Sequence, residues 1–308
     1  MSTVLLTGGT GMIGTQIVKR LTERGYSVIV LTRNKSNKKG NIRYAHWDVE
    51  KETIDMDAVA EADFIMHLAG ANIAGKRWTE ERKRTIIESR VKSGELLVKT
   101  LSTINHKVKV FVSASAIGWY GADPVIPNSH PFEETFSHAK DFLGDACYKW
   151  EQSILPVTDL GIRLAIFRTG IVLSNEGGAL KEFKRSLKLG VAAILGSGKQ
   201  IISWIHIDDL VELYIKGIED TAFEGIYNAV APDPVSNKVF MKELAKESNK
   251  NFFLTIPVPQ FVLKIILGEM STEVLKSTTV SSSKAQHAGF KFSYPTIHAA
   301  IEQLLAQK

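Results

Sequence analysis

The sequence of 308 residues has little cysteine and no long apolar run. Its single cysteine, Cys147, excludes an internal disulfide and favours a reducing compartment. No apolar stretch approaches the ~18 residues that a membrane-spanning helix needs. The opening residues, MSTVLLTGG, lack the basic flank and the longer apolar region of a signal peptide. We therefore expect a cytoplasmic protein without a membrane partner.

Histidines are scattered and no cysteine cluster exists, so no metal-ligand spacing appears and we expect no metal. The net charge is +5, and part of it comes from a basic cluster without an acid, at Arg33, Lys35, Lys38, Lys39 and Arg43. No aromatic residue is interleaved in this cluster and no nucleic-acid motif accompanies it. We expect no nucleic-acid partner. An anionic small molecule, or for the lysines merely a solvated loop, explains the charge.

The strongest motif lies at the start of the chain. An apolar run at 3–7 is typical of a buried parallel strand, and the sequence GGTGMIG follows it with Gly8, Gly11 and Gly14 spaced as G-x-x-G-x-x-G. An amphipathic helix and a second strand at 27–33 come next. This context predicts a dinucleotide site, because glycines allow a tight turn and close approach to a pyrophosphate, which the helix N-terminus attracts.

The end of the second strand indicates which dinucleotide is bound. Binders of NAD usually place an acid there for the ribose 2′-hydroxyl, but this chain has Arg33. A guanidinium suits a 2′-phosphate through charge-assisted hydrogen bonds, so the sequence favours NADP(H) over NAD(H).

Alternating strand and helix patterns continue along the chain. We predict further strands at 42–48, 63–70, 108–115 and 161–173, and a long helix from about Thr79 to Ser102. This alternation predicts an α/β fold with a Rossmann-type doubly wound parallel sheet. His67, inside an apolar run, is interpreted as a core histidine rather than a base, and Asp48 either meets the adenine or closes a surface turn.

Several blocks resemble a known family. TGGTGMIG, HLAG, SAS followed by Tyr120–Gly121, and WIHIDDL are similar to the extended short-chain dehydrogenases/reductases, which include nucleotide-sugar epimerases. GANIAGKRWTEERKRTIIESR (70–90), RTGIVLSNEGGAL (168–180) and GFKFSYPTIHAAIEQLL (289–305) resemble an atypical epimerase-family branch that ends in a small domain of unknown function. The resemblance implies an NADP(H) site formed by Thr7, Gly8, Gly11, Met12, Ile13, Gly14, Thr32, Arg33, Leu68, Ala69, Arg90 and Val172. The small residues that end the strand at 63–70 add Gly70, where the dinucleotide can lie against backbone.

The catalytic residues of that family match less well. Its tyrosine and lysine stand four residues apart on one helical face, with a glutamate four residues further on. Counting back from Glu151 places Cys147 and Leu143 at these two positions, and Tyr148 lies one residue out of register. Ser115 matches the family's serine. The catalytic candidates are therefore Ser115, Tyr120 and Tyr148, with Lys83, Arg77, His206 and Asp208 as further groups that could bind or polarise a substrate.

The remaining chain predicts a smaller, mostly α C-terminal substrate lobe. We divide the sequence into a Rossmann domain at 1–235 and a lobe at 236–308, with 174–203 as a flap or lobe excursion. The expected function is an NADP(H)-dependent oxidoreductase or epimerase-like enzyme on a small carbonyl, alcohol or sugar-nucleotide substrate. The alternative is a non-catalytic NADP(H)-binding regulatory or scaffold protein. The macromolecular partner that we consider is a second copy of the chain, in a homodimer.

Overall fold

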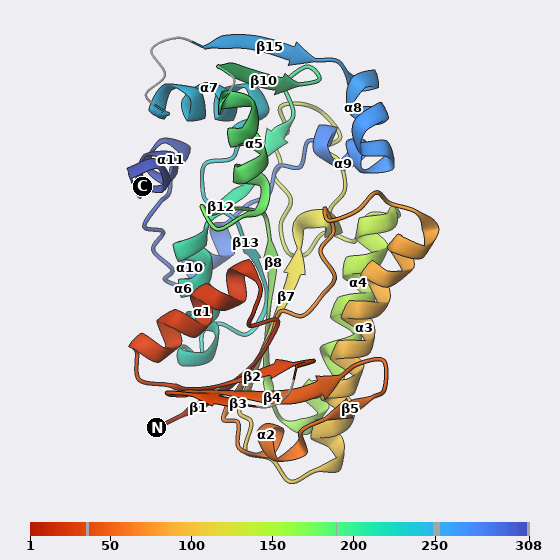
Figure 1. Cartoon of the computed structure of the whole chain (residues 1–308), viewed down its shortest axis with the longest axis vertical. Helices are drawn as coiled ribbons and strands as arrows, with labels where there is room; N and C mark the ends of the chain where they lie inside the picture. The colour runs from red at the N-terminus through yellow and green to blue at the C-terminus, as the bar shows by residue number, and fades with distance from the viewer. Residues whose placement is uncertain (35–36, 189, 249–252, 307–308) are drawn as a thin grey trace.

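The computed structural model describes residues 1–34, 37–188, 190–248 and 253–306. Its main element is a large sheet that is parallel from β13 to β4, with antiparallel additions beyond (Figure 1). In spatial order the strands are β13 (Gly225–Ala229), β8 (Arg163–Thr169), β7 (Val110–Ala116), β6 (Phe64–His67), β1 (Thr3–Thr7), β2 (Ser27–Thr32), β4 (Ile42–Asp48) and β3 (Asn37–Lys39), with β5 (Thr53–Ile54) beside β4.

Helices cover both faces of this sheet. One face holds α1 (Met12–Glu23) and α6 (Ile207–Glu219), and the other holds α2 (Met56–Ala60), α3 (Glu80–Thr103) and α4 (Phe142–Ile154). Short 3-10 turns η1 (Ile117–Trp119) and η2 (Leu155–Leu160) follow β7 and α4. Successive residues of β1 alternate between the two cores, which is why its sequence is apolar throughout. The doubly wound parallel sheet predicted from the sequence is confirmed.

Most predicted elements lie where the sequence placed them. The helix expected near Thr79 begins at Glu80, and the Thr79 hydroxyl accepts a hydrogen bond from the Arg82 amide as an N-cap. The strand predicted at 63–70 ends at His67, so Leu68 to Gly70 form a loop at the carboxyl edge of the sheet. Within the described parts of the chain, none of the helices combines the length and apolarity that crossing a bilayer requires.

The strand predicted at 161–173 is divided at Gly170. Before it, β8 belongs to the main sheet, whereas after it β9 (Ile171–Leu173) pairs with β12 (Trp204–His206). The Gly170 amide donates to Ala229 and the next amide donates to Ser203. A Cβ on Gly170 would lie 2.6 Å from the Ser203 carbonyl oxygen, so the close crossing of two backbones requires glycine here. Apolar periodicity alone did not reveal this change of partner.

An upper core, separate from the two cores on the faces of the main sheet, is formed by elements that lie above that sheet in Figure 1. Its apolar side chains come from segments far apart in the sequence, with Leu180, Ile194, Phe240 and Ile301 among them. The contributing elements are α5 (Gly178–Lys188), β10 (Val191–Leu195), β11 (Ile201–Ile202), β14 (Val235–Ser236), α7 (Asn237–Glu247) and α11 (Ile297–Ala306). The segment 174–203 thus supplies α5 and β10 to this core. The division of the chain at residue 235 stays a prediction.

The rest of the C-terminal portion is largely helical, as predicted. It contains α8 (Gln260–Leu267), η3 (Gly268–Met270), α9 (Ser271–Leu275) and α10 (Ser283–His287). Sequence patterns missed β15 (Leu254–Val258), which pairs in parallel with β10. The amides of Leu254 and, by alternation, Ile256 and Val258 point to β10, so Thr255 and Pro257 present their backbone to the free edge.

Candidate functional site

The turn between β1 and α1 has the geometry of an anion site. Gly8 has φ +69°, a left-handed conformation that favours glycine, and its carbonyl accepts the Gly11 amide at 3.0 Å. Gly11 is the N-cap of α1 and offers no side-chain cap, so Met12 and Ile13 open the helix with their amides in the uncapped first turn. This helix N-terminus points out of the carboxyl edge of the sheet, where doubly wound folds bind ligands.

Neighbouring backbone sets the glycine pattern. A Cβ on Gly14 would overlap the Gly8 carbonyl oxygen, and one on Gly8 would lie 2.9 Å from the backbone of Leu68. Gly14 therefore packs against the loop itself rather than against the strand. Gly9 has the strand contact, since its Cβ would lie 2.8 Å from the Val30 side chain. The doubled glycine of GGTG was the available signal for Gly9.

Thr7 holds the two loops of the site together. Its buried hydroxyl accepts the amides of Leu68 and Ala69 at 3.0 and 3.1 Å, and lies 2.8 Å from His67 Nδ1. With both acceptor positions used, the hydroxyl donates to Nδ1, so the proton of His67 is on Nε2, which donates to Ser93. Burial lowers the pKa of His67 to about 3. The interpretation of His67 as a core histidine is therefore supported, and contact of Thr7 with a pyrophosphate stays a prediction.

The end of β2 presents an unpaired cation. Arg33 is exposed directly after Thr32, and among the described residues no carboxylate pairs with it. Thr32 Oγ1 accepts the Asn34 amide at 3.2 Å and so shapes this turn. Arg43, from the same basic cluster, instead binds Asp55 and Glu61. Lys35 lies outside the described residues, as do the side chains of Lys38 and Lys39.

Asp48 closes a surface turn. Its Oδ1 accepts the amides of Glu50 and Lys51 at 3.1 and 3.2 Å. This favours the second of the two interpretations that the sequence left open, because a carboxylate used to hold a turn has less capacity for an adenine.

Arg90 lies under the loop that follows β6. Its guanidinium is buried against Gly70, where a Cβ would lie 3.0 Å from Cζ, and it stacks over Trp150 at 5.0 Å. Nη1 donates to the carbonyls of Ala71 and Ile86. Burial lowers the pKa of Arg90. The loop Leu68 to Gly70 and Arg90 are therefore one unit at the sheet edge, and their contact with a cofactor stays a prediction.

The upper core reaches the glycine turn through the segment after β9. Val172 lies in β9 opposite Ile205 and packs against the core on the α1 and α6 face of the main sheet. A Cβ on Gly178, the first residue of α5, would lie 3.4 Å from Met12. The start of α5 thus covers the start of α1. Met12 and Val172, predicted as cofactor neighbours, belong to one wall of the site.

Ser115 belongs to a buried polar network at the end of β7. Its hydroxyl donates to Glu151 Oε1 at 2.6 Å, and the same carboxylate accepts two hydrogen bonds of 2.9 Å from Arg168. The guanidinium of Arg168 lies 3.6 Å from the centre of the Trp119 ring. Sequence reasoning missed Arg168, although an arginine within an apolar strand indicates a buried carboxylate partner.

Tyr120 lies at the other end of this network. Its hydroxyl donates to Asn228 Oδ1 at 2.6 Å and accepts from Arg168 at 3.0 Å. Burial raises the pKa of Tyr120 to about 12, although Arg168 opposes the shift. Such a phenol is a weak acid at neutral pH. The catalytic roles of Ser115 and Tyr120 stay predictions, and the geometry gives both a structural task.

The face of α4 that would hold a catalytic pair is apolar. Leu143 and Cys147 pack near Gly118 of η1, and Cys147 Sγ donates weakly to the Ala116 carbonyl at 3.5 Å. Burial raises the pKa of Cys147 to about 12, so the thiol is a small packing group. Tyr148 is 39% exposed and stacks on His138 with ring centres 4.4 Å apart. It lies on a different side of the helix, as the register predicted, and its catalytic role stays a prediction.

The WIHIDDL segment anchors the C-terminal chain. His206 Nδ1 accepts the Asp208 amide and caps α6, while Nε2 bonds to Gln303 at 2.9 Å. Asp209 accepts the amides of Ser293 and Tyr294. Burial lowers the pKa of His206. These contacts give the segment a structural role, and roles of His206 and Asp208 at a substrate stay predictions.

The basic residues proposed for an anionic substrate are occupied. Lys83 pairs with Glu269 at 2.6 Å and Glu80 at 3.1 Å, and Arg77 donates to the carbonyls of Ile265 and Ile266. The hydrogen bond to Glu269 is the main reason that the pKa of Lys83 is raised. Both residues therefore fasten α8 and η3 to the start of α3.

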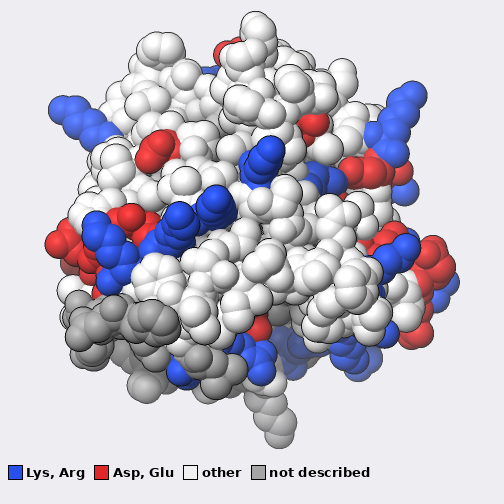
Figure 2. Space-filling view, turned by 90° about the horizontal axis from the view of Figure 1, so that it is seen from above, with Lys and Arg blue, Asp and Glu red and all other residues white. Residues whose placement is uncertain are grey.

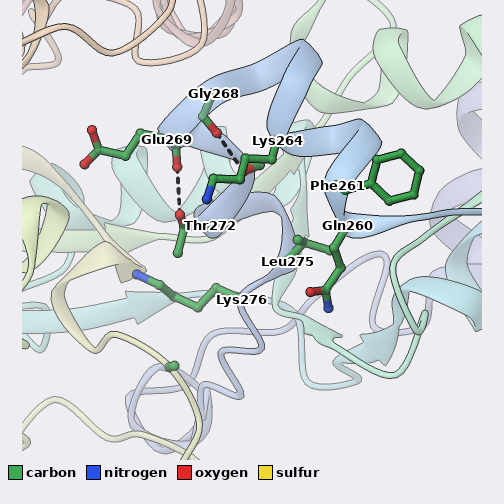
Figure 3. Close-up of a pocket in the computed structure, with 10 residues that line it drawn as sticks. Gln260, Phe261, Lys264, Gly268, Glu269, Thr272, Leu275 and Lys276 are labelled. Atoms are coloured by element: carbon green, nitrogen blue, oxygen red, sulfur yellow. Dashed lines mark hydrogen bonds between the residues drawn. The ribbon is translucent and has the colours of Figure 1, made fainter.

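A pocket of about 930 Å³ lies beside this junction, between α8 and α9 (Figure 3). Its lining includes Ala122, Gln260, Phe261, Lys264, Glu269, Thr272, Leu275 and Lys276. Lys276 binds Asp141, the N-cap of α4, at 2.8 Å. The pocket is thereby linked to the helix whose first turn borders the end of β7.

One group with metal-ligand chemistry occurs among the described residues, although none was predicted. Ligand atoms of Glu243, Glu247 and His298 lie within 4.8 Å of one another. Lys246 lies 3.7 Å from both carboxylates and competes for them. The group bridges α7 and α11 as a surface ion-pair cluster.

Comparison with known proteins places this geometry in context. Residues 4–229 match the NAD dependent epimerase/dehydratase family, and residues 258–304 match DUF1731, a domain of unknown function. Epimerase family protein SAR0825 of Staphylococcus aureus is 36% identical over 310 residues, covering 100% of both chains. Epimerase family protein SH2119 of Staphylococcus haemolyticus is 37% identical and covers 99% of each.

Solved structures of epimerase-family proteins are similar to this chain as well. Human epimerase family protein SDR39U1 (isoform 2), crystallised with NADPH, superposes with a TM-score of 0.86 at 26% identity, covering 99% of this chain and 100% of that one. A nucleoside-diphosphate sugar epimerase from Corynebacterium glutamicum has a TM-score of 0.78 at 31% identity, and the match covers 99% of this chain but 58% of the other.

Proposed function

The chain belongs to the NAD dependent epimerase/dehydratase family, and from this premise we propose that it is an NADP(H)-dependent oxidoreductase or epimerase-like enzyme. Its substrate is a small carbonyl, alcohol or sugar-nucleotide compound. The residues Thr7, Gly8, Gly11 and Gly14 form the pyrophosphate end of the site, and Leu68 to Gly70 with Arg90 and Val172 form the wall along the rest of the dinucleotide. The proposed compartment is the cytoplasm, where Cys147 stays reduced.

The preference for NADP(H) is supported by one observation above all. Arg33 is an exposed guanidinium without a carboxylate partner among the described residues, one residue beyond a strand that ends beside an uncapped helix N-terminus. An acid at that place would repel a 2′-phosphate, whereas a free guanidinium binds it with two hydrogen bonds. The NADPH carried by the human relative agrees with this choice.

The proposed chemistry is hydride transfer without the family's tyrosine–lysine pair. When bound, the cofactor supplies or accepts the hydride. This chain contributes an apolar wall at Leu143 and Cys147 that limits water beside the reacting carbon. Ser115 matches the family's serine and is the hydroxyl proposed to bind the substrate oxygen. Water or a substrate group completes the proton transfer.

A second candidate is a non-catalytic NADP(H)-binding protein with a regulatory or scaffold role. The observation that favours it is that Ser115 and Tyr120, two of the three catalytic candidates, are occupied by structural hydrogen bonds. Ser115 and Tyr120 are committed to Glu151 and Asn228, and the pKa values of Tyr120 and Cys147 are raised by burial to about 12.

Calorimetric titration with NADPH and NADH tests the cofactor assignment. Wild-type protein should bind NADPH more tightly, and Arg33→Glu should weaken NADPH binding by more than tenfold while leaving NADH nearly unaffected. Lys19→Glu, at an exposed position of α1, is the control with the same change of charge. Equal losses for both dinucleotides would contradict the assignment to Arg33, and absence of binding to either would remove the proposed function.

Substrate-dependent NADPH oxidation across a carbonyl library separates the two candidates. The enzyme hypothesis predicts turnover that Ser115→Ala lowers strongly in kcat, beyond any change in the unfolding midpoint. Ser113→Ala, two residues earlier on the same strand, should retain turnover, because the Ser113 hydroxyl bonds only to the Ala114 carbonyl among the described residues. Tight NADPH binding without turnover of any carbonyl would favour the non-catalytic protein.

A further inference from the structure

The pocket between α8 and α9 has an asymmetric lining. In Figure 3 the amino groups of Lys264 and Lys276 point to the same side as Thr272, whereas Phe261 and Gln260 lie on the other side of the helix. Leu275 and Ala122 add apolar surface. The Thr272 hydroxyl donates to the Glu269 carbonyl at 2.8 Å. One side of the pocket is therefore cationic, and the remainder is largely apolar.

The charges around the pocket differ in how far they are compensated. Lys276 pairs with Asp141 at 2.8 Å and Glu273 at 2.6 Å, and these partners raise its pKa against the opposing effect of burial. Glu269 is held by Lys83. Among the described residues, Lys264 has no carboxylate partner, so it is the lining ammonium that is left free for an anionic ligand.

Basic side chains are also found on the described surface at this end of the molecule. Figure 2 shows the end of the molecule that carries α8 and β15 as mostly uncharged, with several basic side chains across it and acidic ones mainly towards the sides. Exposed apolar side chains on α8, Phe261 and Ile265 among them, continue the apolar character of the pocket to the surface.

We propose that this pocket binds a monocarboxylate with an apolar body. The carboxylate lies beside Lys264, on the side of the pocket that also carries Lys276, and the apolar body lies against Leu275, Ala122 and the base of α8. One free ammonium matches one negative charge, whereas a phosphate dianion would leave charge uncompensated in a partly apolar site. The volume is within the ~300–1,000 Å³ typical of small-molecule sites.

The place of the pocket connects it to the proposed reaction. Ala122 follows the segment that leaves β7, and Lys276 binds the N-cap of α4, so the pocket borders the sheet edge on the substrate side. Identification of the carboxylate as the substrate rests on the proposed function. Its binding in the pocket does not, because none of the lining residues belongs to the glycine turn or to the turn after β2.

Calorimetry with octanoate, octylammonium and octanol tests the proposal on the full chain. Octanoate should bind at least tenfold more tightly than the other two, because only it combines an apolar chain with an anionic head. Lys264→Glu should weaken octanoate binding at least tenfold and favour octylammonium instead. Lys242→Glu, an exposed lysine of α7 outside the pocket, is the matched control and should retain wild-type octanoate binding.

Three outcomes would overturn the proposal. They are octanoate binding no tighter than octanol, equal losses in both lysine variants, and no measurable octanoate binding. The same titrations on Arg33→Glu keep the two ideas apart, since octanoate binding should persist there while NADPH binding is lost. Failure of octanoate with intact NADPH binding rejects the pocket assignment alone, and the reverse result rejects the cofactor assignment alone.

Discussion

Arg168 holds the carboxylate of Glu151 through two parallel hydrogen bonds of 2.9 Å, and the side chains are 1% and 3% exposed. The pair joins β8 to α4 beneath the end of β7. Burial would lower the pKa of Arg168, but its bonds to Glu151 outweigh that effect and raise it. Two buried charges of this kind depend on one another, because either alone would be a desolvated ion without a partner.

Glu151→Gln should therefore destabilise the protein strongly. Removal of one member of a buried ion pair typically costs about 3–5 kcal/mol, since the remaining charge is left uncompensated. Urea denaturation measures the change in unfolding free energy. Glu182→Gln breaks an exposed pair with Arg185 and should leave the denaturation midpoint nearly unchanged. A similar small effect at both positions would contradict the mutual dependence of Glu151 and Arg168.

Alanine at two glycines of the turn should give different results. Gly14→Ala inserts a methyl group against the Gly8 carbonyl, so both the thermal midpoint and NADPH affinity should fall. Gly11→Ala faces only one contact, at 3.3 Å, and should lower NADPH affinity with little loss of stability. Thermal unfolding and calorimetry measure the two effects. Gly75→Ala, whose Cβ would make ordinary contacts, is the control, and identical behaviour of the two turn variants would refute the distinction.

Cys147 should be unreactive in the folded protein. Burial raises its pKa to about 12, so at pH 8 almost no thiolate forms, and the sulfur is covered by η1 and α4. Iodoacetamide should label the native chain slowly and the chain unfolded in guanidinium chloride rapidly, as mass spectrometry can follow. Fast labelling of the native protein would instead identify Cys147 as an accessible reactive thiol.

His67 should make the protein less stable in acid. Its folded pKa is about 3, below the usual 6.5, so between these values the unfolded chain binds a proton that the folded chain does not. Stability should then fall by about 1.4 kcal/mol for each pH unit below 6.5, until about pH 3. Urea denaturation at pH 4, 5 and 6 should show a shallower dependence for His67→Gln, with exposed His287→Gln as the control for loss of a histidine. An unchanged slope in His67→Gln would rule out this source of acid sensitivity.

The fold could be predicted because its signals are local. Buried parallel strands give apolar runs, and the glycine turn after β1 follows from the spacing of Gly8, Gly11 and Gly14. Thr79 marked the start of α3 by its capping chemistry. The divided strand at Gly170 and the pairing of β10 with β15 depend instead on segments about 30 to 65 residues away, to which a local pattern is blind.

The candidate site was predictable in part for the same reason. Helical register placed Cys147 and Leu143 on one face of α4 and Tyr148 on another, and the structure has that arrangement. The partners of Lys83 and Arg77 were not predictable, because Glu269 and the carbonyls of α8 approach only in the folded chain. Spatial pairing therefore changed which cation is left available, from Lys83 to Lys264.

Pro257 has a consequence for how copies of this protein meet. The backbone nitrogen of Pro257 faces the free edge of β15 and carries no hydrogen. It therefore cannot donate a hydrogen bond to a further strand at this edge. Addition of a strand at this edge is thereby disfavoured, even though Leu254 and Ile256 are apolar and exposed. We therefore expect self-association at this end to use side-chain surfaces rather than backbone ladders.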